Sequence, residues 1–360
     1  MKWQWLFFLI PVAAWAAPSI SDVSWSGSLS DGTELTITGT DFGADGPTVV
    51  LFDDFEDGTV PNAIPADRTA PVGQYSGTQG TNPGYFSSTS AYSGAQSMQH
   101  DYTLGSSVYQ EVLFSPVDPQ EVLIAYSWFC PSGANLPGEG HEEQTNWKLV
   151  WLMGDDSAAD DDVNLPVIFG DQLDVLITGN DTPLDALSLY VGGPDGNVKG
   201  EWHRYVSYIK AGESLDGVLE LHEIGTSGVT VRYSSQTITT QNSGDQWERF
   251  HVPGYGRDNA VGGNSYGNFD DIYIATGAAR ARVEVTNNGT YASSTSMGLG
   301  TPTAWSDTSM TVVFRQGNLT TGAAYVYVVD TDGNRSSGFE VTIGAEAGSG
   351  TQRPSGVTVR

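Results

Sequence analysis

One stretch near the end of the chain decides the fold: Asn268-Phe269-Asp270-Asp271-Ile272-Tyr273-Ile274-Ala275. Its β-branched and aromatic residues follow a turn-forming Gly-Asn pair, which predicts a short β-strand. A similar acidic and aromatic stretch, Phe52-Asp53-Asp54-Phe55-Glu56-Asp57-Gly58, lies far earlier in the chain. The two stretches bracket a long segment rich in β-forming residues. We therefore expect them to be the first and last strands of one sandwich.

The bracketed segment, residues 50–276, shows no amphipathic helix. It consists of short runs of β-forming residues that are separated by clusters of Gly, Pro, Asn and Asp, which predicts an antiparallel sandwich of two sheets. The fold class that we expect is all-β. The candidate strands are Ser107–Phe114, Glu121–Phe129, Gln144–Met153, Ala186–Gly192, Trp202–Lys210, Gly217–Glu223, Thr230–Tyr233 and Phe269–Ala275.

The two flanks of this segment together have the sequence pattern of one small β-domain. After an Asp-Gly turn, Leu35 and Ile37 alternate with threonines as in a half-buried strand. The phrase Asp31–Gly43 resembles the start of an IPT/TIG domain, an immunoglobulin-like module, and Trp305–Phe314 and Gly322–Ser337 resemble its last strands. The resemblance implies a split small β-sandwich, residues 18–49 and 279–344, whose family serves in spacing and interaction.

The inserted segment has its own resemblance. The phrases Glu201–Lys210, Asp216–Leu221 and Phe269–Ile274 are similar to those of concanavalin A-like or laminin-G-like jelly rolls. The resemblance implies an antiparallel jelly-roll sandwich over residues 50–276. It also implies one of the activities of that superfamily, whose members are mostly lectins, carbohydrate-binding modules, glycoside hydrolases and polysaccharide lyases.

The composition excludes several classes of function. Lys and Arg number 15 against 43 Asp and Glu, so the net charge is −28. Such a surface repels phosphate backbones, which excludes nucleic acid as a partner. It favours solubility in a salty exterior and also supplies carboxylates for hard cations. The single cysteine, Cys130, stands among bulky aromatic residues, which favours a buried small hydrophobic side chain over a nucleophile.

The N-terminus has the pattern of a signal peptide, residues 1–17. Lys2 supplies the positive charge, Leu6–Ala14 the apolar core, and Ala14-Trp15-Ala16 the small-residue cleavage pattern. The sequence therefore predicts a secreted or cell-surface protein, with no membrane insertion of the mature chain. Residues 345–360 are rich in Gly, Ser, Thr and Pro, which predicts a flexible tail.

One candidate binding surface lies on the predicted strand around Gln144–Met153. Strict alternation places Trp147, Leu149 and Trp151 on the core side. Polar side chains on the other face offer the donors and acceptors that sugar hydroxyls need. An ordinary solvated sheet face is the alternative. The candidate ligand-binding residues are Glu142, Gln144, Asn146 and Lys148.

A catalytic interpretation has less support. The Glu-x-Asp-x-x-Glu pattern of retaining glycoside hydrolases is absent. The phrase Tyr208–Gly212 is similar to the Tyr-Phe-Lys-x-Gly phrase of alginate-lyase-like proteins, but their Arg-rich and Gln-x-His strands are missing. A strongly negative protein is also an awkward host for a polyuronate. If the protein were a lyase, the candidates would be Tyr208, Lys210, His203 and His222. Otherwise the two histidines belong to the sheets or the core.

The best metal candidates are the two acidic stretches Phe52–Gly58 and Asn268–Ala275, which we call the first and second acidic brackets. If the first and last strands are adjacent, their carboxylates could share one Ca²⁺, and the jelly-roll resemblance implies a structural calcium at this place. Two solvated turns are the alternative. The cluster Asp155–Asp162 lacks EF-hand spacing, which predicts a solvated loop with weak cation affinity. The predicted calcium ligands are Asp54, Glu56, Asp57, Asp270 and Asp271.

These observations together predict a secreted, non-catalytic, lectin-like or adhesion protein that recognises an extracellular polysaccharide or cell-surface glycan. A polysaccharide lyase or glycoside hydrolase is one rival hypothesis. A structural subunit of a cell-surface appendage is the other.

Overall fold

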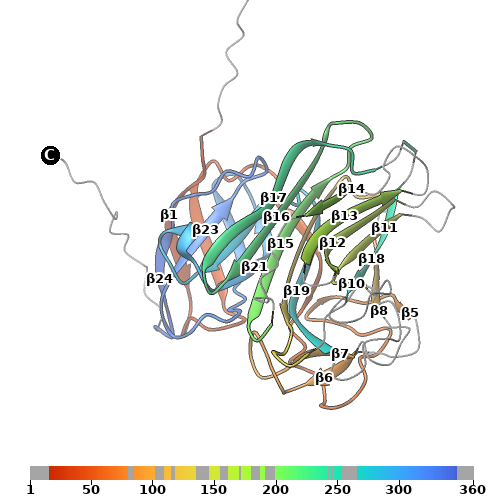
Figure 1. Cartoon of the computed structure of the whole chain (residues 1–360). Coiled ribbons are helices and arrows are strands. Elements are labelled where there is room, and N and C mark those ends of the chain that lie inside the picture. The colour runs from red at the N-terminus through yellow and green to blue at the C-terminus, as the bar shows by residue number, and fades with distance from the viewer. Residues whose placement is uncertain are drawn as a thin grey trace, which may run out of the picture.

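The computed structural model describes residues 16–79, 84–101, 109–114, 118–134, 146–154, 161–169, 172–179, 187–190, 199–241, 243–244, 246–252 and 266–346. These ranges form antiparallel β-strands and one short 3-10 helix, η1 (Tyr291–Ser293) (Figure 1). The prediction of an all-β, antiparallel fold with an immunoglobulin-like module is confirmed.

Strands from both ends of the chain build one sheet of seven strands, which we call the Ig-like sheet. Red and blue strands lie together in Figure 1, on one side of the molecule. Its apolar core contains Ile37, Val283, Val312 and Val326, each at most 1% exposed. In hydrogen-bonded order the strands are β1 (Ser19–Trp25), β2 (Glu34–Thr40), β22 (Ser309–Val313), β21 (Met297–Trp305), β20 (Arg282–Thr286), β23 (Gly322–Val329) and β24 (Phe339–Ile343).

The rest of the chain folds into two further sheets. The nine-stranded sheet runs in the order β17 (Gly228–Ile238), β16 (Gly217–Gly225), β15 (Trp202–Lys210), β9 (Glu121–Phe129), β19 (Tyr266–Gly277), β3 (Pro47–Asp53) and β4 (Val72–Gly73). Off this path, β7 (Ser97–Asp101) pairs with β19 and with β6 (Tyr85–Ser87). The expected neighbours β3 and β19 are adjacent, with Asp53 opposite Ile272, which confirms that prediction.

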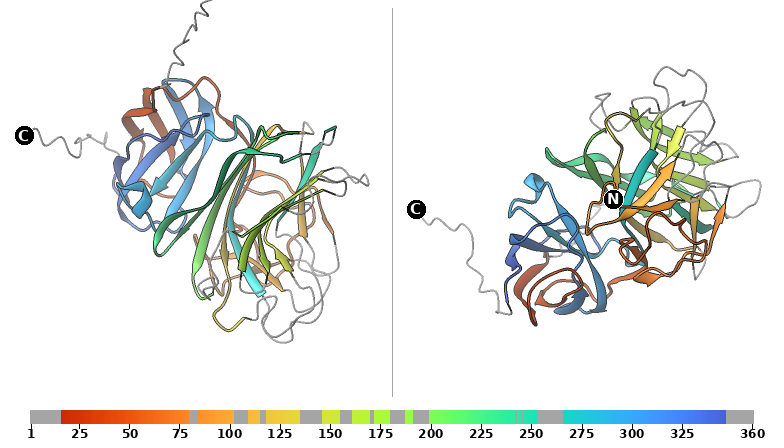
Figure 2. Two further views of the ribbon diagram at one scale, coloured as in Figure 1. Left: turned by 45° about the horizontal axis from the view of Figure 1, so that its top comes forward. Right: turned by 90° about the horizontal axis from the view of Figure 1, so that it is seen from below.

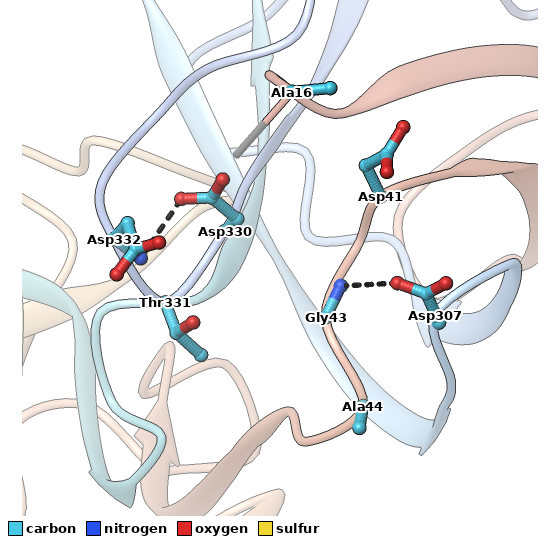
Figure 3. A pocket seen from close by; sticks show the side chains of 8 residues that line it. All are labelled: Ala16, Asp41, Gly43, Ala44, Asp307, Asp330, Thr331 and Asp332. Atoms are coloured by element: carbon cyan, nitrogen blue, oxygen red, sulfur yellow. Dashed lines mark hydrogen bonds between the residues drawn. The ribbon is translucent and has the colours of Figure 1, made fainter. Parts of the chain in front are cut away.

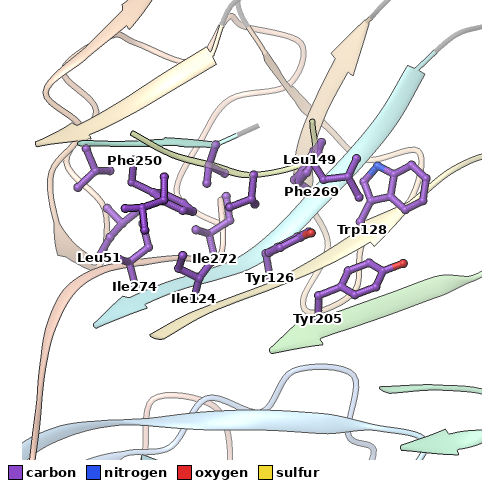
Figure 4. Packing of buried hydrophobic residues seen from close by; sticks show 14 of the residues in the cluster. Leu51, Ile124, Tyr126, Trp128, Leu149, Tyr205, Phe250, Phe269, Ile272 and Ile274 are labelled. Atoms are coloured by element: carbon purple, nitrogen blue, oxygen red, sulfur yellow. The ribbon is translucent and has the colours of Figure 1, made fainter. Parts of the chain in front are cut away.

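The eight-stranded sheet faces the nine-stranded one. Its order is β14 (Leu187–Tyr190), β13 (Gln172–Gly179), β12 (Asp161–Phe169), β11 (Trp151–Gly154), β18 (Trp247–Val252), β8 (Tyr109–Leu113) and β5 (Gly77–Gln79). The short β10 (Asn146–Lys148) also pairs with β12. Phe250 and Leu149 from this side pack against Ile124 and Ile274 of the nine-stranded sheet (Figure 4).

The central strand β9 shows how alternation divides the apolar residues between two cores. Val122, Ile124, Tyr126 and Trp128 point into the sandwich, toward the eight-stranded sheet. Leu123 and Ala125 point the other way, into a second cluster. Because side chains of a strand alternate between its faces, a strand that is apolar at every position must be covered on both sides.

The second cluster joins the sandwich to the Ig-like sheet. Leu123 and Tyr273 from the nine-stranded sheet pack there with Met297 and Leu299 of β21. The Tyr92 hydroxyl donates to the Met297 carbonyl at 3.0 Å, and Arg280 pairs with Glu220 at 2.6 Å. Figure 2 shows the two parts of the chain in contact along this face. We call this contact the domain seam.

A β-bulge interrupts β19 at the acidic pair that opens the sequence analysis. The pairing with β9 shifts between Asp270 and Tyr273, and Asp271 has a positive φ of 47°. The shift places both Phe269 and Ile272 in the sandwich core, although they are three residues apart. The bulge therefore points the two buried carboxyl groups away from the apolar core residues of β19.

Two expectations about the strands were wrong. The predicted strand Gln144–Met153 is divided into two shorter strands, β10 and β11. Between them, Leu149 and Val150 are both fully buried, so the side chains no longer alternate between the two faces of the sheet. The predicted solvated loop Asp155–Asp162 lies partly in β12, which begins at Asp161 and pairs with β11 and β13. Residues 155–160 of that loop lie outside the described ranges.

Candidate functional site

The sandwich has two outer faces, and the domain seam covers that of the central strands of the nine-stranded sheet, whereas Val231 of β17 is 57% exposed. The outer face of the eight-stranded sheet is defined by three neighbouring strands. Leu152, Phe250 and Val112 of β11, β18 and β8 point into the core. Since side chains alternate along each strand, the residues next to them point outward.

A row of polar and aromatic residues crosses this outer face. Trp151 lies opposite His251, and His251 lies opposite Glu111. Arg249 stands two residues before His251 and therefore points to the same side. We call Glu111, Trp151, Arg249 and His251 the outer-face cluster.

Glu111 is the centre of the contacts within this cluster. Its Oε2 lies 3.1 Å from Nε2 of His251 and 3.5 Å from Nη1 of Arg249. The second guanidinium nitrogen of Arg249, Nη2, lies 3.2 Å from Oε2 of Glu248. The indole of Trp151 meets the imidazole of His251 edge-on, with ring centroids 5.6 Å apart and an interplanar angle of 85°. The cluster is therefore fixed in place by its own ion pairs and ring contact.

Such a row suits the recognition of sugars. The partly exposed indole of Trp151 supplies a flat apolar surface for a sugar ring, and the largely buried His251, Arg249 and Glu111 fix its position. Ligand sites in proteins commonly combine an apolar surface with a few fixed polar groups. The outer-face cluster is our candidate functional site.

Most of this cluster was not predicted from the sequence. No strand was predicted for β18, although Arg249-Phe250-His251-Val252 alternates between polar and apolar residues. That alternation was the signal that could have found Arg249 and His251. Trp151 was predicted to point into the core with Leu149, which is wrong: the break at Leu149 and Val150 changes the alternation, and Trp151 contacts His251 instead.

Two of the four predicted ligand-binding residues are described, and only in their backbone. Glu142 and Gln144 lie outside the described residues. Asn146 and Lys148 are on β10, where their backbones lie opposite Phe169 and Val167 of β12. Since β12 also pairs with β11, β10 belongs to the same sheet as Trp151. Their role in binding stays a prediction.

The four residues proposed for a lyase do not come together. Tyr208 belongs to the domain seam, where Arg280 lies over its ring at 5.2 Å. Lys210 and His222 alternate onto that same face of β15 and β16. Burial lowers the pKa of His222. His203 points to the opposite face, so the four residues cannot act together on one substrate.

His203 belongs to a separate buried ion-pair group. Its Nδ1 lies 2.6 Å from Oε1 of Glu223, whose other oxygen, Oε2, contacts Arg232. Burial alone would raise the pKa of Glu223, but the hydrogen bonds from His203 and Arg232 hold it below its ordinary value. This arrangement agrees with the alternative prediction that His203 belongs to the sheet, where its hydrogen-bonding partner is Glu223.

The first acidic bracket is occupied by an arginine. Nε and Nη2 of Arg68 each lie 2.7 Å from one oxygen of Asp53, and Nη2 also lies 2.6 Å from Oδ1 of Asp57. Asp54 accepts the backbone N–H of Glu56 at 3.3 Å. Oε1 of Glu56 accepts the backbone N–H groups of residues 95 and 96 at 2.8 and 2.7 Å.

The second bracket holds the loop that follows β6. Oδ2 of Asp270 accepts the N–H groups of Tyr92 and Ser93 at 2.7 and 3.0 Å, and Asp271 accepts the Ser93 hydroxyl at 2.7 Å. Burial raises the pKa of Asp271 to about 6, although the charge of Arg204 opposes this. Burial and the charge of Asp271 raise the pKa of Asp270 as well.

These contacts bear on the calcium prediction. Most carboxylate oxygens of the two brackets already accept bonds from protein donors, so the arrangement does not fit a shared calcium ion. Within the described residues, no group of three or more His, Cys, Asp and Glu side chains converges as a metal site. Calcium binding stays an untested prediction from the sequence, whereas these contacts predict that the two brackets bind no calcium.

A cavity of about 580 Å³ lies at one end of the Ig-like sheet (Figure 3). Its carboxylates hold turns: Asp307 accepts the N–H of Gly43 at 3.1 Å, and Asp330 accepts those of Asp332 and Asn334 at 2.9 and 2.8 Å. Its lining residues are Ala16, Asp41, Gly43, Ala44, Asp307, Asp330, Thr331 and Asp332. These bonds give Asp307 and Asp330 a structural role in the loops that line the cavity.

Comparison with known proteins gives one family match. The model of the IPT/TIG domain matches residues 18–56. No curated protein matches the chain. In the described part of the chain, no helix is both long and apolar enough to span a bilayer.

Solved structures similar to this chain include three polysaccharide lyases. An endo-β-1,4-glucuronan lyase from the fungus Trichoderma reesei is 13% identical, over 64% of this chain and 96% of that one, with a TM-score of 0.45. The alginate lyase Aly36B is 12% identical, over 64% and 97%, with a TM-score of 0.45. A marine PL-14 alginate lyase from Aplysia kurodai is 12% identical, over 64% and 100%, with a TM-score of 0.43. At these values the similarity carries no argument about activity.

Proposed function

We propose that this protein is secreted or displayed at the cell surface and that it binds an extracellular polysaccharide through the outer-face cluster without cleaving it. The observation that carries the proposal is the alignment of Trp151, His251 and Glu111 across three adjacent strands. The indole of Trp151 is partly exposed, while the side chains of His251, Arg249 and Glu111 are 0%, 11% and 12% exposed and hold it in place. A row of this kind extends across the strands, as an extended glycan chain requires.

The rival is a lyase that acts at the same cluster. An imidazole that can move a proton and a guanidinium that can stabilise a negative charge stand on one face, as His251 and Arg249 do. In this structure both groups face Glu111, which favours a fixed binding surface over a poised base and cation. An assay for products decides between the two.

The test is affinity electrophoresis of the full chain in gels that contain soluble polysaccharides. Trp151→Ala should lower the affinity for the retaining polysaccharide by about tenfold, because aromatic stacking and its buried area are lost. The control is Val231→Ala, which truncates an exposed apolar residue on β17 of the other sheet. Retention unaffected by Trp151→Ala would contradict the proposed site.

The same samples are assayed for cleavage. Binding without catalysis predicts no new reducing ends and no ultraviolet-absorbing unsaturated sugars in the retained polysaccharide. If unsaturated products form, His251→Gln and Arg249→Gln should abolish them while Val231→Ala leaves them unchanged. That outcome would replace the binding proposal with the lyase.

A further inference from the structure

The last six residues of the sequence repeat, without change, the start of an edge strand. Residues 227–232 and residues 355–360 both read Ser-Gly-Val-Thr-Val-Arg. The first copy leads into β17, and the second belongs to residues 347–360, which lie outside the described ranges. We propose that residues 355–360 add a strand to the free edge of β17 in the same molecule.

The free edge is the side of β17 that faces away from β16. Among the described strands, β17 is the last of the nine-stranded sheet, so its backbone groups on this side have no neighbouring strand. Its pairing with β16 is regular from Gly228 to Val231 and shifts before Tyr233. The repeated sequence therefore covers the regular part of the strand. An edge of this kind is a template to which another extended segment adds by main-chain hydrogen bonds.

The side chains of β17 favour such an addition. Val231 is 57% exposed, and Val229, two residues earlier on the same face, packs against the domain seam. A strand with the same alternation places its own two valines on that face, where they extend the apolar surface and cover Val231. Arg232 is the only charged residue of β17, and it contacts Glu223. The strand also lacks the Lys and Pro residues that commonly protect an edge from pairing.

Charge favours residues 347–360 as the added segment. They contain two arginines, Arg353 and Arg360, and no Asp or Glu, whereas the whole chain has a net charge of −28. A cationic segment is attracted to an anionic protein, and this attraction weakens as salt is added. Two copies of the whole chain repel each other for the same reason, which favours docking within one molecule.

The sheet register places the end of the described chain near η1. Thr286, the last residue of β20, lies opposite Tyr325 of β23. Gly322, at the start of β23, lies opposite Ile343, the last residue of β24. β24 and β20 therefore end at the same end of the Ig-like sheet, and η1 follows β20 there.

The start of β17 lies at this same place. Gly228 packs on η1 so closely that a Cβ atom at this position would lie 2.6 Å from the carbonyl oxygen of Ala292. β24 is two strands away from β20, or ~10 Å at the usual strand spacing. The nine residue steps from Glu346 to Ser355 span up to ~30 Å when extended. The second copy of the sequence can therefore reach β17 of its own molecule.

The test is amide hydrogen exchange of β17 in the full chain and in a variant that ends at Glu346. Strand addition predicts that those amides of residues 228–231 that face the free edge exchange at least about tenfold more slowly in the full chain, because a ladder hydrogen bond protects them. Sedimentation velocity at each protein concentration used reports whether the protein is a monomer.

Two threonines outside the described fold provide a matched pair of variants. Thr358→Pro lies inside the repeated sequence, where proline removes a backbone donor and disrupts strand pairing. It should abolish the protection as fully as the deletion does. Thr351→Pro makes the same change outside the repeat and should leave the protection in place.

Each outcome supports or overturns the proposal. Protection that is independent of protein concentration in a monomer, and that only Thr358→Pro and the deletion remove, supports it. Equal exchange in the full chain and the shortened variant overturns it, and so does protection that survives Thr358→Pro. Protection that appears only as dimers form assigns the added strand to a second copy and overturns docking within the molecule.

Discussion

The buried carboxylate Glu284 offers a sharp test of the energetics at the domain seam. It is fully buried on β20, and its oxygens lie 2.7 Å from Nε of Arg282 and 2.9 Å from Nε of Arg335. The guanidinium of Arg335 also lies 3.4 Å from the ring centroid of Tyr291. Glu284→Gln keeps the size of the side chain but leaves two arginines without their counter-charge.

The size of the effect follows from burial and charge. Removing one partner of a buried ion pair costs about 3–5 kcal/mol. At roughly 2–4 °C per kcal/mol, the melting midpoint should fall by on the order of 10 °C. The matched control is Glu340→Gln, on an exposed position of β24 in the same sheet, which should change the midpoint little.

The same carboxylate predicts a dependence on pH. Burial alone would raise the pKa of Glu284, but the charges of Arg282 and Arg335 lower it from 4.5 to about 2. Because the folded-state pKa is lowered, the stabilisation is present above about pH 4.5 and is lost as the pH falls toward 2. The difference corresponds to roughly 3 kcal/mol, at about 1.4 kcal/mol per pH unit.

The assay is urea unfolding of the wild type, Glu284→Gln and Glu340→Gln at several values between pH 7 and pH 2, followed by circular dichroism. The stability difference between wild type and Glu284→Gln should be largest at neutral pH and should shrink below pH 4.5. A difference that stays constant over this range would refute the assignment of a charged Glu284. A Glu284→Gln protein as stable as the control would refute the buried pair itself.

Two further predictions concern the brackets and the seam. The melting midpoint of the wild type should be the same with calcium and with EDTA, since protein donors occupy the bracket oxygens. A calcium site would instead raise the midpoint, stabilising the fold by up to ~2.7 kcal/mol at a calcium concentration 100 times Kd. The double substitution Asp270→Asn with Asp271→Asn would then abolish that rise. Replacing residues 50–276 by a Gly-Ser linker should leave a folded Ig-like domain by circular dichroism but expose Met297 and Leu299 of the seam, both at most 1% exposed in the whole chain. Size-exclusion chromatography should then show self-association that glutamines at these two positions reduce, and a monomeric unsubstituted deletion would contradict the seam.

The fold class could be predicted because local patterns agree with the tertiary arrangement. β9 and β15 have the predicted bounds, Glu121–Phe129 and Trp202–Lys210, since both are long runs of β-branched and aromatic residues. The adjacency of β3 and β19 followed from two similar acidic stretches. A prediction from a local pattern succeeds where most residues of a segment favour the same secondary structure.

The candidate site could be predicted only in part, because alternation does not survive an irregularity in the strand. Leu149 and Val150 interrupt the predicted strand, and their joint burial moves Trp151 onto the outer face. The cluster also combines residues from strands far apart in sequence, such as Glu111 and His251, which only the sheet register places together. No local pattern contains that register.

The seam also restricts where a ligand can bind. Tyr208, the best sequence match to a lyase phrase, lies under the Ig-like part of the chain, with Arg280 over its ring. A β-sandwich offers two broad outer faces, and an inserted module that packs one of them against its host keeps only the other for an extended ligand. In this protein the remaining face is that of β11, β18 and β8, where Glu111 already pairs the local cations. The position of the Ig-like sheet therefore restricts the proposed glycan binding to this remaining face.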